Sequence, residues 1–436
     1  MPTRHLIGRL TVEIALPGAD GALARLQEIG GWARSDGLWR DLSRALDQLV
    51  PPDEVVTIPR LELTVEVNSE AAFQSQLRRA LTRAVGQLLQ RRDSAAGRRS
   101  LGQYTEALVW HFLATGALPW TAPQDQGPAV ANFLNNLPDV ENEAFVERLR
   151  AASAASPVPW QRLVYAIGLE KARRLVLRYG SFAPPQAAEL LQIATAAEQQ
   201  SSLAAIRFWQ NIFINTELHN SEIAAFRGAV RQAAQAAGAT AEARPPVHAT
   251  QEADRAAAGP TAADEPVAGA YFVQNAGLVL LNQFLPAQFR QTDLLAGDDF
   301  RDEEARCQAI HLLQFLATGE TEAYEYDLLL NKLLCAHPLG RPVPRWVPLT
   351  DADLGQADEL LRAAIGHWRV LRNTSVAGLR ETFLRRPGKL APAEGGGWRL
   401  QVERRTVDIL LDRLPMGWGY SVVSLPWRPD LIFVEW

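Results

Sequence analysis

The amino-acid sequence predicts a mainly α protein with small β elements at both termini, an α+β fold in which two helical lobes are joined by a disordered linker. Three observations predict this class. Apolar residues recur at three- and four-residue spacing through most of the chain, alternating apolar and polar residues are confined to its two ends, and a stretch in the middle lacks large apolar side chains. Because 47% of the residues are apolar, the chain can bury a sizeable core.

Residues 1–100 are predicted to form a β-α-β-α unit. Alternation over residues 6–16 predicts a first strand, and the leucine spacing over residues 18–49 predicts a helix, which the Pro-Pro pair that follows it ends. Glycines in the middle of this segment leave two shorter helices as the alternative. Alternation over residues 55–67 predicts a second strand. The Asn-Ser-Glu sequence after it favours the start of another helix, which runs to about residue 92.

The middle of the chain is predicted to be helical and then disordered. Prolines divide the helical region over residues 101–235 into short helices rather than one rod. Residues 236–266 are rich in Ala, Glu, Pro and Gly and cannot bury enough apolar surface to offset the entropy of ordering. We therefore expect a disordered linker there.

The C-terminal part is predicted to be a helical domain over residues 267–390, with its helical pattern beginning at about residue 272. Thr350 and Asp353 have the spacing of a capping box at a helix start. Lys332, in a leucine-rich helix, has Glu325 as a candidate partner.

The last segment, residues 391–436, is predicted to be a β-rich cap. Its strands are expected over residues 398–404, 419–425 and 430–436, while residues 408–414 fit either a helix or a strand. The last strand is apolar, and an unpaired apolar strand is a sticky edge. We expect it to be paired in the fold or with a partner, with the N-terminal strands as candidate neighbours.

The pentapeptide Phe-Leu-Ala-Thr-Gly occurs twice, ending at Gly116 and at Gly319. In both places it ends an apolar helical pattern, and glycine suits the position after a helix because it adopts the left-handed conformation at little cost. We interpret the two segments as a related pair of helical units, although an ordinary pair of antiparallel helices gives the same pattern by chance.

Charge and cysteine content argue against several classes of partner. The net charge of −5 and the pI near 5.9 argue against nucleic acid or an anionic membrane as partner. No apolar run approaches the ~20 residues that span a bilayer, and the first residues lack the pattern of a signal peptide. Two cysteines cannot form a disulfide framework, so we expect reduced thiols and synthesis in a cytoplasm.

Catalytic and metal-binding signatures are not found in the sequence. It has no phosphate-binding loop, nucleophile elbow, His-Glu-x-x-His segment or zinc-spaced cysteine pair, so we expect no enzyme activity, cofactor or metal. His111 and His311 occupy matching positions in the two helical units. We interpret them as partly buried histidines bonded to the backbone.

Tryptophan is the unusual feature of the composition, with twelve residues. Trp120, Trp418 and Trp427 lie close to prolines or glycines, and Trp436 ends the last apolar strand. Tryptophan is enriched at the energetic centre of protein interfaces, so these four residues are candidate partner-binding residues. The alternative is a tryptophan that packs over a turn as a local part of the core.

Several segments together resemble the contractile injection system tape measure protein family. The final segment 398–436, with its two Leu-Pro pairs and four tryptophans, resembles the end of family members. Further segments that resemble the family, in the same order along the chain, are 112–120 (FLATGALPW), 273–281 (VQNAGLVLL), 311–319 (HLLQFLATG) and 329–335 (LLNKLLC).

The resemblance implies a structural component of a phage-tail-like contractile injection particle, governing the assembly or the length of its inner tube. It implies inner tube and baseplate or spike proteins as partners, with the system's associated ATPase and self-association as further candidates. It also implies cytoplasmic assembly and a final place in the lumen of the particle. The alternative is a cytosolic helical adaptor or chaperone that loads cargo into such a particle.

Overall fold

The computed structural model describes residues 43–44, 46–47, 54–58, 61, 76, 79–87, 97–119, 122, 126–180, 182–200, 202–215 and 269–436. The chain divides into two compact units, Met1–Leu108 with Thr121–Ala129, and Val109–Trp120 with Val130–Trp436. The first predicted strand, most of the helix after it, the predicted linker and Trp120 lie outside the described residues. None of the described helices is long and apolar enough to cross a membrane.

The described part of the first unit contains a short antiparallel pair of strands. Strand β1 (Glu54–Thr57) pairs with β2 (Gly97–Ser100), so that Glu54 lies opposite Ser100. The strand predicted over residues 55–67 is therefore confirmed at its start, whereas β2 was not predicted. Residues 79–87 are helical and bury Leu81, in agreement with the helix predicted there.

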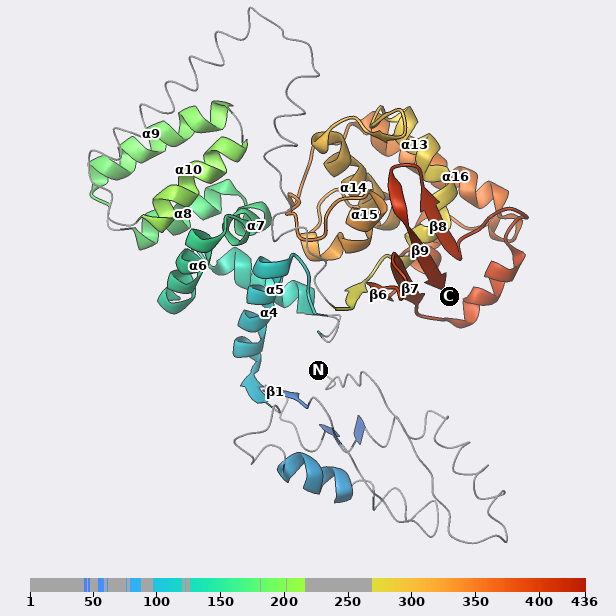
Figure 1. Cartoon of the computed structure of the whole chain (residues 1–436), viewed down its shortest axis with the longest axis horizontal. Helices are drawn as coiled ribbons and strands as arrows, with labels where there is room; N and C mark the ends of the chain where they lie inside the picture. The colour runs from blue at the N-terminus through green and yellow to red at the C-terminus, as the bar shows by residue number, and fades with distance from the viewer. Residues whose placement is uncertain are drawn as a thin grey trace, which may run out of the picture. The chain divides into compact units, whose positions relative to one another are not determined.

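The predicted helical region is confirmed as a series of short helices (Figure 1). Pro157 precedes the helix that begins at Val158, and Pro184 begins another, so prolines divide the region as expected. We call the described residues from Val109 to Asn215 in the second unit the helical lobe. The helices are α4 (Leu101–Thr115), α5 (Gln126–Asn136), α6 (Glu143–Ala155), α7 (Val158–Ile167), α8 (Leu169–Tyr179), α9 (Pro184–Gln200) and α10 (Ser202–Ile214).

The helical lobe has an aromatic core. Trp160 and Phe213 stack with ring centroids 4.7 Å apart, and both rings are buried. The indole Nε1 of Trp160 donates to the carbonyl of Ile206 at 3.1 Å. Helices α7 and α10 are therefore held together by both apolar contact and a hydrogen bond.

Residues 269–436, here called the C-terminal lobe, combine helices with a sheet. The capping box predicted at Thr350 is confirmed, since Thr350 N donates to Asp353 Oδ2 at 2.9 Å and Asp353 N donates to Thr350 Oγ1 at 3.2 Å. The helices are η1 (Ala276–Phe284), α13 (Leu285–Gln291), α14 (Glu303–Thr318), η2 (Glu325–Asp327), α15 (Leu329–Leu334), α16 (Asp351–His367), η3 (Arg369–Leu371), α17 (Val376–Leu379), η4 (Arg380–Leu384) and η5 (Thr406–Arg413).

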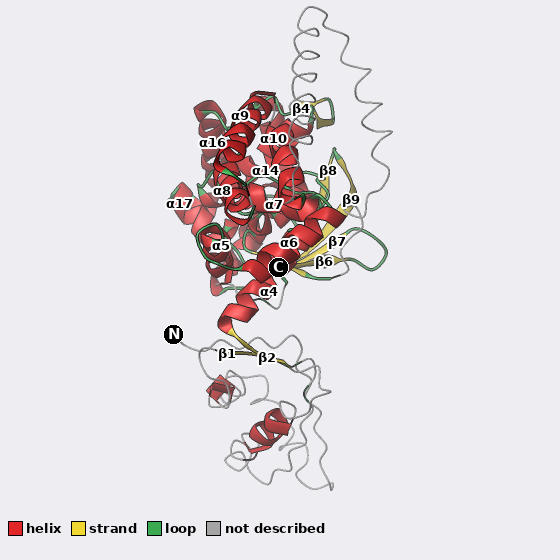
Figure 2. Ribbon diagram, turned by 90° about the vertical axis from the view of Figure 1, so that its left-hand side faces the viewer, coloured by secondary structure: helices red, strands yellow, loops and turns green. Residues whose placement is uncertain are grey.

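The sheet of this lobe has five strands in the order β3-β6-β7-β9-β8. Strands β7 and β9 are parallel, and the other neighbours are antiparallel. Figure 2 shows strands β6 to β9 together along one side of the helices of this lobe. The strands are β3 (Tyr271–Val273), β6 (Gly388–Pro392), β7 (Trp398–Val402), β8 (Val422–Leu425) and β9 (Arg428–Glu435), and a separate hairpin has β4 (Leu295–Ala296) and β5 (Asp299–Phe300).

The three closing strands predicted in the β-rich cap are confirmed with shifted ends, and the ambiguous segment 408–414 is helical as far as Arg413. Strand β9 has β7 on one side and β8 on the other. The expectation that N-terminal strands lie beside it is therefore wrong, because both of its edges are occupied. Strands β3 and β6 were not predicted, and β3 covers residues where a helix was expected to begin.

One face of the sheet carries the core of the lobe. Leu400, Val423 and Ile432 are buried on that face, whereas Val422 and Phe433 are exposed on the other. Val422 and Phe433 stand opposite each other across the β8–β9 pair. The alternation that predicted these strands therefore corresponds to one buried face and one exposed face.

Candidate functional site

Trp418 is built into the core of the C-terminal lobe. Its side chain is buried, and its indole Nε1 donates to the carbonyl of Leu280 at 2.7 Å. The ring meets Phe284 edge-on at 5.1 Å. In this fold the residue joins the segment before β8 to helix η1.

Trp427 is also buried. Its indole Nε1 donates to the carbonyl of Leu334 at 2.8 Å. Its ring lies 5.4 Å from that of Phe289 and 5.3 Å from that of Phe300. In this conformation Trp418 and Trp427 both contact other parts of the chain, and their binding of a partner stays a prediction.

Trp436 is half-buried and lies in a polar setting. Its indole Nε1 donates to Asp408 Oδ2 at 3.0 Å, and Arg386 lies over the ring at 5.3 Å. Arg404 donates to the carbonyl oxygen of Trp436 at 2.7 Å. Trp436 is thus held from three sides at the end of β9.

The carboxylate under Trp436 is fixed by a buried arginine. Arg386 donates to both oxygens of Asp408, at 2.7 Å each. Burial raises the pKa of Asp408, but hydrogen bonds from Arg386, from the backbone of Arg405 and from Trp436 outweigh it and hold the pKa below its ordinary value. The ionised form of Asp408 is therefore the one that makes these contacts in the folded state.

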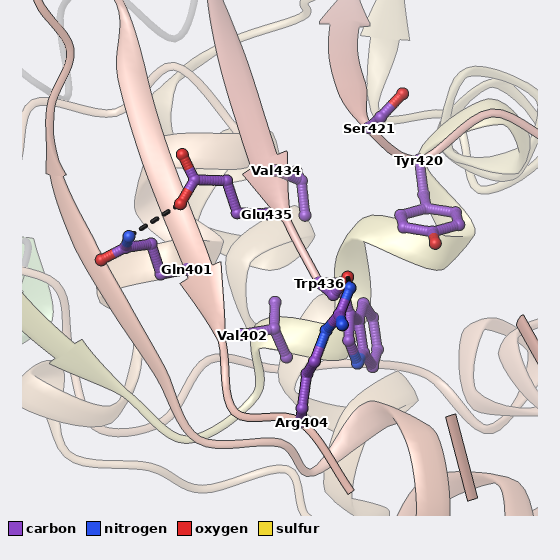
Figure 3. Close-up of a pocket in the computed structure, with 8 residues that line it drawn as sticks. All are labelled: Gln401, Val402, Arg404, Tyr420, Ser421, Val434, Glu435 and Trp436. Carbon is purple, nitrogen blue, oxygen red and sulfur yellow. Dashed lines mark hydrogen bonds between the residues drawn. The ribbon is translucent and has the colours of Figure 1, made fainter. Parts of the chain in front are cut away.

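An open pocket of about 540 Å³ lies beside Trp436 (Figure 3). It combines an indole, a phenol, a guanidinium and a carboxylate, which suits contact with a polypeptide segment. No histidine lies next to its single serine among the lining residues, so the pocket offers no serine–histidine pair. The lining residues are Gln401, Val402, Arg404, Tyr420, Ser421, Val434, Glu435 and Trp436.

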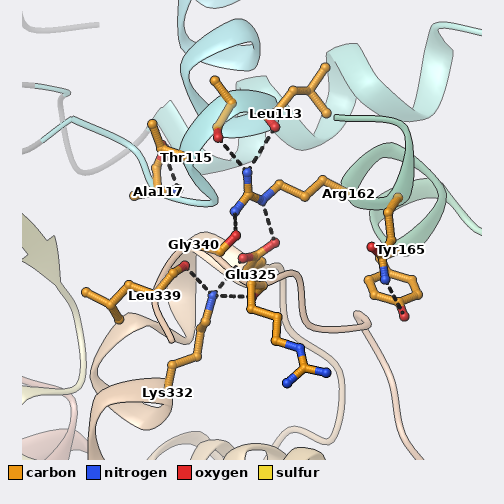
Figure 4. A network of polar contacts seen from close by, with 12 residues as sticks. Leu113, Thr115, Ala117, Arg162, Tyr165, Glu325, Lys332, Leu339 and Gly340 are labelled. Carbon is orange, nitrogen blue, oxygen red and sulfur yellow. Dashed lines mark hydrogen bonds and ion pairs between the residues drawn. The ribbon is translucent and has the colours of Figure 1, made fainter. Parts of the chain in front are cut away.

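A second constellation lies where the helical lobe contacts the C-terminal lobe (Figure 4). The fully buried Arg162, on α7, donates from Nε to Glu325 Oε2 at 3.2 Å. Its Nη1 donates to the carbonyls of Leu113 and Ala114 at 3.1 and 2.7 Å, and its Nη2 donates to the carbonyl of Gly340. The guanidinium therefore caps the end of α4 and binds the C-terminal lobe at the same time.

Lys332 completes this constellation from α15. Its Nζ donates to Glu325 Oε1 at 2.8 Å and to the carbonyls of Leu339 and Arg341 at 2.6 and 2.7 Å. Glu325, the candidate partner of Lys332 in the sequence, is thus one of its partners in the structure. Burial lowers the pKa of Lys332, and the charge of Glu325 opposes this shift. We call Arg162, Glu325 and Lys332 the buried charge cluster.

Gly116 allows α4 to approach the buried charge cluster closely. Its φ of 78° is left-handed, as predicted for the residue after a helix. A Cβ atom at this position would lie 2.3 Å from Glu325 Oε1. A glycine is therefore required both by the backbone conformation and by the carboxylate next to it.

The second Phe-Leu-Ala-Thr-Gly segment ends its helix in the same way. Gly319 has a φ of 81°, and Thr318 Oγ1 donates to the carbonyl four residues earlier at 2.8 Å, as Thr115 Oγ1 does at 2.7 Å. Arg380 donates to the carbonyls of Phe315 and Leu316 at 3.1 and 3.2 Å. The two helix ends thus share their backbone, their threonine contact and a capping arginine.

Each capping arginine is paired with a carboxylate. Arg380 donates to Asp358 Oδ1 at 2.9 Å, within the C-terminal lobe. Arg162 instead reaches Glu325 from another lobe. Sequence reasoning missed Arg162, although a lone arginine in the apolar run of α7 was a usable signal.

Burial and backbone contacts mark His111, His311 and Cys307 as structural residues. His311 is buried with its ring nitrogens 3.3 Å from the carbonyl of Thr321 and 2.8 Å from that of Pro344, as predicted. Burial lowers the pKa of His111 and raises the pKa of Cys307 to about 12, which makes this thiol a poor nucleophile. Within the described residues, no group of three or more His, Cys, Asp or Glu side chains is placed to hold a metal ion.

Comparison with known proteins gave one match. The model of a family described as contractile injection system tape measure protein matches residues 4–436. No curated protein and no solved structure matches the chain.

Proposed function

Because the chain belongs to the contractile injection system tape measure protein family, we propose that it governs the assembly or the length of the inner tube of a contractile injection particle. The family consists of structural proteins, so the chain acts through protein–protein contacts. Its partners are the other components of the particle, among which we propose the inner tube and the baseplate or spike. The system's ATPase and a second copy of the chain are further candidates.

Two mechanisms fit a tape measure-like protein. A literal ruler needs a long helical segment, because an α-helix rises ~1.5 Å per residue. A compact assembly factor needs only a folded body that starts or stabilises the growing tube. The two mechanisms differ in whether the compact fold of the helical lobe persists during assembly.

The lengths of the helices favour the compact factor. Among the described helices, α9 and α16 are the longest, with 17 residues each, so each is only ~25 Å long. The helical lobe also packs around its own aromatic core at Trp160. A ruler made from this lobe would first have to give up that packing. The helix lengths are the observation that carries the proposal of a compact factor.

The outer face of the sheet and the pocket beside Trp436 are the proposed contact surface. Val422 and Phe433 expose apolar side chains on that face, about half and two-fifths accessible. Trp436 stays a partner-binding candidate because it is half-buried and borders the open pocket. The proposed location is the lumen of the particle, after synthesis in the cytoplasm.

Deletions measured by electron microscopy test the proposal. A complete deletion of the gene is expected to abolish or randomise tube assembly, and the wild-type gene supplied in trans must restore it. In-frame deletions within residues 121–235 are expected to leave tube length unchanged and reduce the number of particles. Shortening in proportion, by at most ~1.5 Å per residue removed, would instead establish a ruler.

Two further outcomes separate this proposal from the alternative. A tape measure-like component stays in purified particles, whereas a cytosolic adaptor or chaperone does not. Normal particle length and yield after the complete deletion would defeat both mechanisms and leave the adaptor.

A further inference from the structure

The two lobes of the second unit have apolar cores that are largely separate. The apolar core of the C-terminal lobe takes in buried side chains from Tyr271 to Val434. From the helical lobe it includes Ala117, while Trp160 and Phe213 belong to the lobe's own buried aromatic packing. Largely separate cores allow two bodies to part with little loss of packing in either one.

The joint between the lobes combines apolar and polar contacts. The buried ring of Phe112, on α4, meets that of Tyr326 edge-on, with centroids 5.4 Å apart. Asn135 Nδ2 donates to the hydroxyl of Tyr324 at 2.8 Å, and Arg345 N donates to the carbonyl of Tyr165 at 3.3 Å. Such groups find water as a substitute partner when an interface opens, so they resist separation only weakly. Two parts of the joint differ from these groups. One is the apolar contact of Phe112 with Tyr326, and the other is the buried charge cluster, whose side chains have no access to water in the joined state.

Glu325 holds two buried cations together. Its Oε2 accepts from Arg162 on one side, and its Oε1 accepts from Lys332 on the other. Removing the carboxylate charge leaves two unpaired cations in a medium of low dielectric, an arrangement far more costly than a broken surface pair. Arg162 and Glu325 belong to different lobes, so water reaches the guanidinium of Arg162 if the lobes separate, without unfolding of either lobe.

We propose that the buried charge cluster holds the two lobes together through Glu325, and we call this contact the latch. Breaking it releases the helical lobe from the C-terminal lobe as a folded body. Opening uncovers the capped end of α4 and the stacked rings of Tyr324 and Tyr326, which lie 5.3 Å apart. The inference concerns the isolated chain and does not depend on the proposed role in the particle.

Hydrogen exchange of the purified full chain carrying Glu325→Gln tests the latch. Amides in residues 112–117, 321–328 and 339–341, at the joint, are expected to exchange about 100-fold faster or more. Amides of α10 and α14, inside the two lobes, are expected to keep their protection. The radius of gyration from small-angle scattering is expected to increase.

The control variant is Asp358→Asn. It removes the carboxylate from the equivalent arginine, Arg380, but inside one lobe. It is expected to speed exchange around the end of α14 and leave the joint and the radius of gyration unchanged. The latch is overturned if Glu325→Gln leaves the joint protected, or if it raises exchange equally throughout both lobes.

A pair of glycine substitutions tests the latch without removing a charge. Gly116→Ala and Gly319→Ala impose the same left-handed strain after the same pentapeptide, with φ values of 78° and 81°. The new methyl group meets Glu325 Oε1 at 2.3 Å in the first case and the end of Arg380 at 3.3 Å in the second. Faster exchange at the joint is expected in Gly116→Ala alone, and equal behaviour of the two variants would contradict the latch.

Discussion

Arg162 and Arg380 cap two helices that end in the same five residues. Each arginine donates to two successive carbonyls at its helix end, although Arg380 binds one position earlier in the shared pentapeptide than Arg162 does. The last carbonyls of a helix have no partner within it, and a cation there also interacts favourably with the helix dipole. The repeated sequence therefore marks a repeated arginine-capped helix end. One copy lies at the joint between the lobes, and the other lies within the C-terminal lobe.

Replacing Arg380 is expected to destabilise the C-terminal lobe. Arg380→Gln loses two carbonyl contacts, the pair with Asp358 and the packing over Phe315, so we expect a loss of about 1–3 kcal/mol in the free energy of unfolding. Urea denaturation measures it. Arg385→Gln is the control, because its pair with Glu381 is exposed and is worth less than about 1 kcal/mol. Equal losses in the two variants would contradict the capping role.

The buried tryptophans are expected to contribute to stability. Trp427→Ala removes a ring packed between two phenylalanines and orphans the carbonyl of Leu334, so we expect a cost of about 3–5 kcal/mol in thermal or urea unfolding. Trp427→Phe keeps most of the ring and is expected to cost about 1–3 kcal/mol. Trp346, whose side chain is exposed, supplies the control, since Trp346→Ala is expected to stay within about 0.5 kcal/mol. A Trp427→Ala protein as stable as the control would show that the packing is not formed.

Removing the last strand is expected to disrupt the sheet. Deletion of residues 431–436 leaves β7 and β8 without the strand that lies between them, and it removes the buried Ile432. We expect a loss of several kcal/mol, because burying Ile432 alone is worth about 2–5 kcal/mol on truncation. Phe433→Ala keeps the strand and changes only an outward ring, so its melting temperature is expected to stay close to that of the wild type. An unchanged melting temperature of the deletion variant would count against the central place of β9.

Stability is expected to fall as the pH rises through the pKa of Asp327. Burial, with a smaller contribution from Glu320, raises the pKa of Asp327 from its ordinary value of 3.8 to about 7. Between these values the folded state holds a proton that the unfolded state has lost. The contribution of this group is therefore fully present below a pH of about 4 and is lost as the pH rises through about 7.

Urea titrations from pH 4 to 8 measure this dependence. Asp327→Asn is expected to flatten the slope of the unfolding free energy against pH, because an amide does not titrate. Asp412→Asn, at an exposed position of η5, is expected to leave the slope unchanged. An Asp327→Asn protein with the slope of the wild type would show that another group is responsible.

Local features of the fold were predictable from the sequence. The capping box of Thr350 and Asp353, the left-handed Gly116 and Gly319, and the alternation in β9 depend on neighbours within a few residues. Glu325 could be named as a candidate partner of Lys332 for the same reason, since the two residues are only seven positions apart. Each of these features follows from the spacing of residue types.

Other features depend on distant parts of the chain. Arg162 and Glu325 lie 163 positions apart, so no local pattern encodes their contact. Strand β6 contains Gly388 and Pro392, which rarely occur in strands, and it forms because β3 and β7 lie on its two sides. The burial of Trp427 likewise depends on where β4, β5 and α13 meet.

The strand order of the sheet also has a consequence for the kinetics of folding. In β3, Tyr271 pairs with Leu390 of β6, and all helices of the lobe except η5 lie between them in the sequence. Joining residues so far apart requires the closure of a long loop, and its entropy is lost before the pairing contributes any free energy. The helices between them, whose contacts are local, are expected to form first, and the docking of β3 onto β6 is expected to be among the last steps of folding.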